Sequence, residues 1–72
     1  MTQTFAIRGD YIQLDQLLKA TGLVESGGAA HAAIAAGEVR VDGAVDTRKR
    51  AKLHPGQCVT FAGASIALVA EG

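Results

Sequence analysis

The stretch Gly37-Glu38-Val39-Arg40-Val41-Asp42-Gly43 is where the chain changes from helical to extended structure. Its two valines alternate with charged residues, as in a half-buried strand, so they are predicted to face the core while the arginine faces solvent. Asp42-Gly43 favours a type I′ turn, which needs positive φ at both central residues. Residues 44–45 are therefore expected to return as the second strand of a hairpin.

Two helices are predicted before this point. In residues 13–21 three leucines recur at helical spacing and form one apolar stripe, and Gly22 is a typical residue just after a helix end. Ser26 is predicted to cap a second, alanine-rich helix that ends at Gly37. Because the link between the two helices is short, they are expected to pack as a helix-turn-helix pair.

Strands are predicted on both sides of this helix pair. Residues 4–8 alternate between polar and apolar side chains, and residues 57–61 and 65–70 do the same after a Pro55-Gly56 turn. Helices grouped early and strands grouped late indicate an α+β fold, with the helix pair packed on a small antiparallel sheet of four to five short strands. The residues expected between the helices and the sheet are Leu14, Leu17, Leu18, Ala33 and Ile34.

Composition narrows the protein class further. The chain has 72 residues, which is enough for one domain over residues 1–72 with a small core. Cys58 is the only cysteine, so no intramolecular disulfide or four-cysteine zinc site can form, which favours a reducing, cytoplasmic setting. Neither a signal peptide nor a transmembrane helix is predicted, because no basic residue precedes the first apolar residues and no long apolar run follows. We expect a monomer with no membrane partner.

The zero net charge hides a basic region. Residues 1–39 carry a net negative charge, whereas residues 40–54 carry a net positive one, concentrated in Arg48, Lys49, Arg50 and Lys52. Residues 46–52 are polar and basic and are expected to form a loop, with Leu53 as its anchor. Because salt screens charges beyond about 10 Å at 0.1 M, this local charge decides what a partner meets near contact.

No pattern of an enzyme is present. Cys58 and His54 lie close in sequence, but no third group orients them as a nucleophilic pair, and a half-buried strand cysteine is the simpler interpretation. Two histidines and one cysteine are too scattered for a metal site. The chain has no phosphate loop and no dinucleotide fingerprint. We expect no catalytic residues, no metal, no cofactor and no small-molecule substrate.

The stretch from Leu14 to Val59 resembles the S-four-like RNA-binding domain, in its small stand-alone bacterial branch. The resemblance rests on a leucine-rich first helix, Gly22, Ser26 opening a second helix, residues 37–43, the basic residues 48–52 and Pro55-Gly56-Gln57. It implies the same fold and a non-catalytic protein that recognises structured RNA, either ribosomal or transfer RNA, with the ribosome as one candidate partner. Two departures stand out. Gly27 and Gly28 replace the basic residue that many members place after the serine, and Asp42 replaces the hairpin asparagine.

The candidate RNA-binding residues combine this resemblance with their chemistry. Duplex RNA presents phosphates and 2′-hydroxyls across a shallow minor groove, so a shaped basic face suits it better than a deep pocket. The predicted contacts are Lys19, Ser26, Gly27, Gly28, His31, Arg40, Arg48, Lys49, Arg50 and Lys52.

Several of these residues have a second explanation. The glycine pair is also compatible with a tight turn, Lys19 with compensation of the helix dipole, and His31 with a surface or half-buried histidine that has no role in binding. Only Tyr11, Phe5 and Phe61 are aromatic, and the two phenylalanines are predicted in the core, which argues against a module that stacks single strands. The alternative function is a protein–protein adaptor or regulatory subunit that uses the same helix pair for docking.

Overall fold

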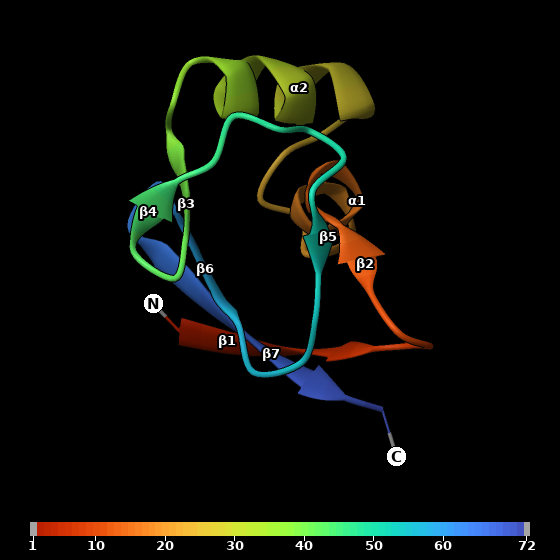
Figure 1. Ribbon diagram of the computed structural model, residues 1–72. Coiled ribbons are helices and arrows are strands. Elements are labelled where there is room, and N and C mark those ends of the chain that lie inside the picture. The colour runs from red at the N-terminus through yellow and green to blue at the C-terminus, as the bar shows by residue number, and fades with distance from the viewer. Residues whose placement is uncertain (1, 72) are drawn as a thin grey trace.

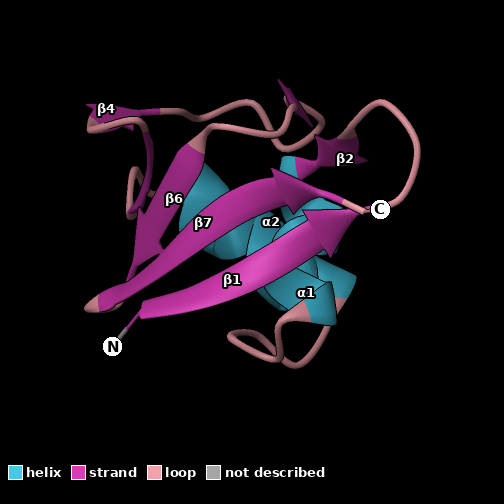
Figure 2. Cartoon of the chain, turned by 90° about the horizontal axis from the view of Figure 1, so that it is seen from below, coloured by secondary structure: helices cyan, strands magenta, loops and turns pink. Residues whose placement is uncertain are grey.

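The computed structural model describes residues 2–71 and consists of a helix pair on one face of a β-sheet (Figure 1). Seen from the sheet side, the strands cross in front of both helices (Figure 2). In chain order the elements are β1 (Thr2–Ile7), β2 (Ile12–Gln13), α1 (Leu14–Ala20), α2 (Gly27–Ala35), β3 (Val39–Val41), β4 (Ala44–Val45), β5 (Lys52–Leu53), β6 (Cys58–Phe61) and β7 (Ala64–Ala70). The predicted α+β class, with two helices on a five-stranded sheet, is confirmed.

The main sheet is mixed, whereas the sequence predicts an antiparallel one. Its strand order is β1-β7-β6-β3-β4, and the pairs β6–β7, β3–β6 and β3–β4 are antiparallel as expected. The difference is β1, which pairs with β7 in parallel. Alternation of polar and apolar residues is the same in parallel and antiparallel strands, so this pattern carries no information about strand direction.

A second, two-stranded sheet is formed by β2 and β5, where Ile12 is paired with Leu53 and Gln13 with Lys52. The sequence predicts a loop over residues 46–52, so the start of β5 at Lys52 shortens that loop. Strands of two residues are too short to show a periodic pattern, which is why this pairing is missing from the prediction.

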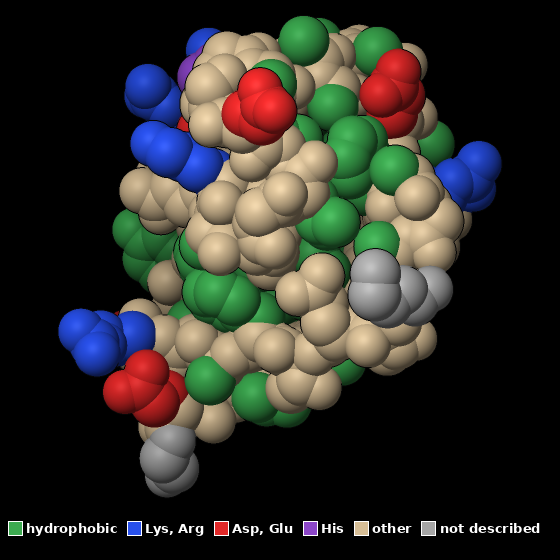
Figure 3. All heavy atoms as spheres, turned by 180° about the vertical axis from the view of Figure 1, so that it is seen from behind, with side chains coloured by type: hydrophobic (Ala, Val, Ile, Leu, Met, Phe, Trp, Pro, Cys, Tyr) green, Lys and Arg blue, Asp and Glu red, His purple; other side chains and the backbone are tan. Residues whose placement is uncertain are grey.

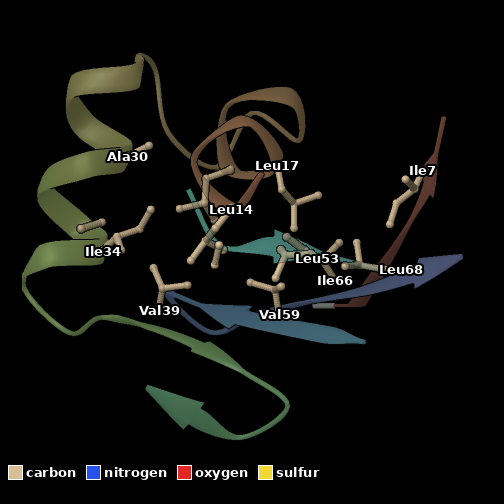
Figure 4. Packing of buried hydrophobic residues seen from close by; sticks show 13 residues of the cluster. Ile7, Leu14, Leu17, Ala30, Ile34, Val39, Leu53, Val59, Ile66 and Leu68 are labelled. Carbon is tan, nitrogen blue, oxygen red and sulfur yellow. The ribbon is translucent and has the colours of Figure 1, made fainter. Parts of the chain in front are cut away.

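The core lies between the helices and the sheet. Figure 4 shows Leu14, Leu17 and Ile34 pointing from the helices toward Val39 and Val59 of the sheet. All five residues predicted in this layer are buried, and Leu53 anchors the end of the basic loop as expected. The buried residues with the largest side chains are Ile7, Leu14, Leu17, Leu18, Ile34, Leu53, Ile66, Val39 and Val59.

The predicted ends and turns also form. The Ser26 hydroxyl accepts a hydrogen bond from the Ala29 amide at 3.1 Å and so caps α2. Asp42 and Gly43 have φ of 52° and 86°, the two positive values that a type I′ turn requires. Between residues 57–61 and 65–70 the polar–apolar alternation alone would place a turn at Gly63-Ala64, whereas the turn lies one residue earlier, at Ala62-Gly63, because Phe61 pairs with Ala64 at the ends of β6 and β7.

Candidate nucleic-acid interface

The basic segment, defined as residues 48–52, packs with its backbone against the start of α1. The Leu14 amide donates to the Ala51 carbonyl and the Asp15 amide to the Lys49 carbonyl, both at 3.0 Å. These bonds satisfy two amides that have no partner within the helix. Ala51 is only 6% exposed, so its methyl group anchors the segment from below. The side chains of Lys49 and Arg50 are therefore left at the surface, beside α1.

Asp15 connects this segment to the second helix. Its Oδ2 lies 2.9 Å from Nε2 of His31 on α2, while its own backbone amide holds the Lys49 carbonyl. Lys19 follows one helical turn after Asp15 and shares its face of α1. The candidate residues gathered around these contacts, which we call the helix-pair surface, are Lys19, Ser26, Gly27, Gly28, His31, Lys49 and Arg50.

The cations of the helix-pair surface carry no counter-charge of their own. Within residues 2–71, the side chains of Lys19, Lys49 and Arg50 form no ion pair and no hydrogen bond, and all three residues are exposed. His31 is half-buried and is the one member with an acidic partner. The surface is therefore able to accept an anion without first giving up an internal contact at these three cations.

The N-terminus of α2 is open. Within the described part of the chain, the backbone amides of Gly27 and Gly28 make no hydrogen bond, whereas Ser26 caps only Ala29. Neither glycine has positive φ, a Cβ at Gly27 would meet nothing within 4 Å, and one at Gly28 would lie 3.9 Å from the Ser26 hydroxyl. The backbone thus does not require glycine at either position. Free amides at a helix N-terminus attract anions, and the absence of side chains leaves room for one.

Arg48 differs from its neighbours because it is held by Asp46. Its Nε and Nη2 donate to the two carboxylate oxygens at 3.1 and 2.9 Å, and its backbone amide donates to Oδ1 at 2.9 Å. The hydrogen bond from the Arg48 side chain is the main reason why the pKa of Asp46 is lowered, and the same bond raises the pKa of Arg48. This pairing offsets the charge of Arg48 locally.

The remaining two predicted cations, Lys52 and Arg40, have other surroundings. Lys52 points over the ring of Tyr11 and lines, with Arg48, a shallow groove that also includes Asp42 and Asp46. Arg40 lies on β3, and its Nη1 approaches the Gly43 carbonyl at 3.5 Å. Figure 1 shows the β3–β4 hairpin on the opposite side of the molecule from α1 and β5. Arg40 therefore does not extend the helix-pair surface.

Asp42, the departure from the family's asparagine, has a structural role. Its Oδ1 accepts a hydrogen bond from the Cys58 amide at 2.9 Å, and its own amide donates to the Cys58 carbonyl at 2.7 Å. Its Oδ2 accepts a hydrogen bond from the side-chain Nε2 of Gln57 at 3.4 Å. The carboxylate thus connects the β3–β4 hairpin to the start of β6.

Sequence reasoning missed Asp15 and Asp46, which are the side-chain partners of His31 and Arg48. For Asp46 a signal exists, since an aspartate two residues before an amide donor is a common Asx turn. For Asp15 there is none, because its partner His31 lies on another helix.

The described residues outside this interface include no metal-binding cluster and no helix of membrane-spanning length. Residues 2–71 contain no group of three or more His, Cys, Asp and Glu side chains that could hold a metal ion. His54 uses its Nδ1 to donate to the Asp10 carbonyl at 3.0 Å, and Cys58 is half-buried in β6 as expected. Neither helix of the described chain has the length and apolar character needed to cross a membrane.

The flank of α2 that faces away from His31 borders an apolar groove. Ala29, Ala32 and Ala36 line it from the helix and Phe61 from β6, with Glu25 and Glu38 as its charged residues. In the view from behind, apolar side chains gather across the middle of the face, and Lys and Arg side chains lie toward its edges (Figure 3). Phe5 and Phe61, which the sequence predicts in the core, are only partly buried and pack against the core cluster.

The chain is similar to known proteins in both sequence and structure. The family model described as "S4 domain" matches residues 5–69. The Escherichia coli (strain K12) protein named "Putative RNA-binding protein YbcJ" is 52% identical over 68 residues, which are 93% of this chain and 97% of that protein. The Shigella flexneri protein "Uncharacterized protein YbcJ" matches to the same extent. A solution structure of E. coli YbcJ, described as revealing an ALFAL motif involved in RNA binding, matches with a TM-score of 0.66 and 49% identity, over 96% of this chain and 86% of that one.

Proposed function

The chain belongs to the S4-domain family, and from this premise we propose that it binds structured RNA, ribosomal or transfer RNA, through phosphate contacts on the helix-pair surface. The related protein named for RNA binding and the solved structure described by an RNA-binding motif support the proposal. The protein acts as a non-catalytic binding module, with structured RNA as its partner and the ribosome as one setting for it.

One observation carries the proposal: the backbone of the basic segment is hydrogen-bonded to α1, so Lys49 and Arg50 are held as unpaired cations next to Asp15, whose side chain reaches His31 on α2. A cation held in place loses less freedom on binding than one on a mobile loop. The arginine adds a planar fork that suits two phosphate oxygens. Phosphates bound here would meet Lys19 and the Gly27 and Gly28 amides as further donors.

The other predicted cations have lesser roles in this proposal. Arg48 contacts a phosphate only by sharing or releasing Asp46, and Arg40 belongs to the β3–β4 hairpin, which lies on the opposite side of the molecule from α1 and β5 (Figure 1). We therefore assign the largest share of the binding free energy to Lys49 and Arg50 within the basic segment.

The decisive experiment compares two double variants that remove the same charge. Lys49→Ala/Arg50→Ala should weaken binding to several structured RNAs alike, and the slope of log affinity against log salt should become shallower by about two units, one per lost phosphate contact. Arg8→Ala/Arg40→Ala is the matched control and should change both quantities much less. Both variants should keep a melting temperature close to that of the parent, because exposed charges add little stability.

Two results would contradict the proposal. Equal loss of affinity in both double variants would mean that only the overall charge matters, without a defined surface. Loss confined to one RNA sequence would mean that the basic segment reads base edges and not phosphates.

The adaptor function keeps one observation in its favour, the apolar groove beside α2. Its acidic residues Glu25 and Glu38 suit a protein segment with one apolar side chain between Lys or Arg residues. RNA binding is favoured because the free cations lie on the other flank of α2. A complex that forms with such a peptide without RNA, and that is lost in Glu25→Lys/Glu38→Lys, would favour the adaptor.

A further inference from the structure

Tyr11 is an aromatic residue that the phosphate contacts leave unused. It immediately precedes β2 and is 41% exposed, whereas Phe5 and Phe61 pack against the core. The chain has no tryptophan and no other tyrosine. Tyr11 is therefore the one Phe, Tyr or Trp residue of the protein that is exposed, since both phenylalanines are partly buried.

The surroundings of Tyr11 combine an aromatic face with a positive charge. The Lys52 ammonium lies 5.1 Å from the centre of the ring, and Lys52 is also the last residue of the basic segment. Such a cation–π pair orients the side chain of the lysine and keeps its charge beside the ring. If Lys52 binds a phosphate of an RNA, the base attached to the same nucleotide is therefore brought close to the ring of Tyr11.

The ring is positioned by ordered neighbours. His54 lies with its ring centre 6.4 Å away at a tilt of 58°, so the two rings do not stack face to face on each other. His54 is itself held, since its Nδ1 donates to the Asp10 carbonyl at 3.0 Å and its backbone amide donates to Gln57 at 2.7 Å. The pairing of β2 with β5 joins Tyr11 and Lys52 through adjacent strands.

We propose that Tyr11 and Lys52 form a subsite for one unpaired nucleobase of a structured RNA, with the base stacked on the phenol and its phosphate near Lys52. The inference rests on the proposed RNA-binding function and adds to it the feature of the RNA that is recognised. A base inside a duplex has both faces covered by its neighbours, whereas a bulged base is free to stack on a side chain. The expected target is therefore a helix interrupted by a bulge or loop.

The test uses two RNA hairpins of the same stem, one fully paired and one with a single bulged adenosine. The parent protein should bind the bulged hairpin about fivefold or more tightly, in line with the typical contribution of one stacked base. Because Tyr11 is the only strong ultraviolet emitter in the chain, stacking should also quench the tyrosine fluorescence with the bulged hairpin and much less with the paired one.

Matched variants separate stacking from other effects. Tyr11→Leu should lose the preference for the bulge while still binding the paired hairpin as the parent does, and Tyr11→Phe should keep the preference because it keeps the ring. An abasic nucleotide at the bulge, which retains the phosphate, should remove the preference in the parent and change nothing further in Tyr11→Leu.

The outcomes distinguish this inference from the function on which it rests. Equal binding of the two hairpins by the parent, or equal weakening of both in Tyr11→Leu, would overturn the subsite while leaving phosphate binding intact. If neither hairpin binds, the proposed function and the subsite fail together. A preference for the bulge that survives in Tyr11→Leu would place the base elsewhere and overturn the assignment to Tyr11.

Discussion

The two helices begin in opposite ways. At the start of α1 the amides of Leu14 and Asp15 are taken by carbonyls of the basic segment. At the start of α2 a single hydroxyl, that of Ser26, caps one amide, and within residues 2–71 those of the two following glycines have no partner. One N-terminus is closed by the fold and the other is left open. The same partial positive charge therefore stabilises the fold in α1 and is available to an anion in α2.

The comparison shows that charge and availability are separate properties of a residue. Arg48 and Arg50 are both exposed arginines of the basic segment, but only Arg48 has a carboxylate bound to its guanidinium. Likewise, the backbone of Lys49 closes a helix end while its side chain remains free. Tertiary contacts decide which groups face a partner.

The largest effect is expected from removing the core contacts that hold α1 in place. Leu17 is fully buried, so Leu17→Ala should lower the free energy of unfolding by about 2–5 kcal/mol through loss of core volume. Denaturation with urea measures it. Val69→Ala, at a position that is 40% exposed, is the control and should cost less than about 1 kcal/mol. A loss below about 1 kcal/mol in Leu17→Ala would show that α1 is not anchored in this way.

A smaller effect is expected where α2 depends on one side chain. Ser26→Ala removes the only side-chain cap of α2 and should lower the free energy of unfolding by about 1 kcal/mol. Ser26→Asp, which retains a capping oxygen, should keep most of that stability. If Ser26→Ala unfolds at the same urea concentration as the parent protein, the start of α2 is held by packing and not by its cap.

Next in size is the test of the open N-terminus itself. Gly27→Asp places a carboxylate beside the free amides, where it repels phosphate, and should weaken RNA binding about two- to fivefold. The same charge suits the helix dipole and should leave folding intact. Gly27→Ala is the control, since its Cβ would meet nothing within 4 Å, and it should bind RNA as the parent does. Unchanged binding by Gly27→Asp would remove the start of α2 from the contact surface.

The smallest effect concerns the paired arginine. Because Arg48 lowers the pKa of Asp46 in the folded protein, the ion pair stabilises the fold above the ordinary carboxyl pKa of 3.8, and this contribution is lost as the pH falls through the lowered value. Thermal unfolding of the parent and of Asp46→Asn should therefore differ near neutral pH and converge in acid. A difference that is constant with pH would mean that the carboxylate acts through something other than its charge.

The sequence predicts those features that depend on neighbouring residues. The leucine stripe of α1, the Ser26 cap and the Asp42-Gly43 turn are local in origin, and the structure confirms them. Periodicity also predicts the buried side of β3 and the presence of β6 and β7. Periodicity does not predict the direction of a strand or the strand with which it pairs. The parallel pairing of β1 with β7 and the short β2–β5 sheet are therefore absent from the prediction.

The same limit applies to the candidate site. Seven of the ten predicted residues belong to the helix pair or to the part of the basic segment bonded to α1, and their role in RNA binding stays a prediction. The contacts between Asp15 and His31, and between Lys52 and Tyr11, join residues far apart in sequence and leave no local pattern. Charge is visible in a sequence, whereas its neutralisation across the fold is not.

The pairing of the first described strand with the last has a consequence for how the chain folds. Thr2 lies opposite Ser65 and Ile7 opposite Ala70, so β1 joins the sheet by closing a loop that contains nearly all of the remaining chain. Closing such a loop costs more entropy than forming a helix pair or a hairpin, and non-local pairings of this kind slow folding. We therefore expect the helix pair and the two hairpins to form first and β1 to dock last. Until it does, β7 is a free sheet edge, and a second chain in solution would find there the same unpaired backbone groups that β1 later covers.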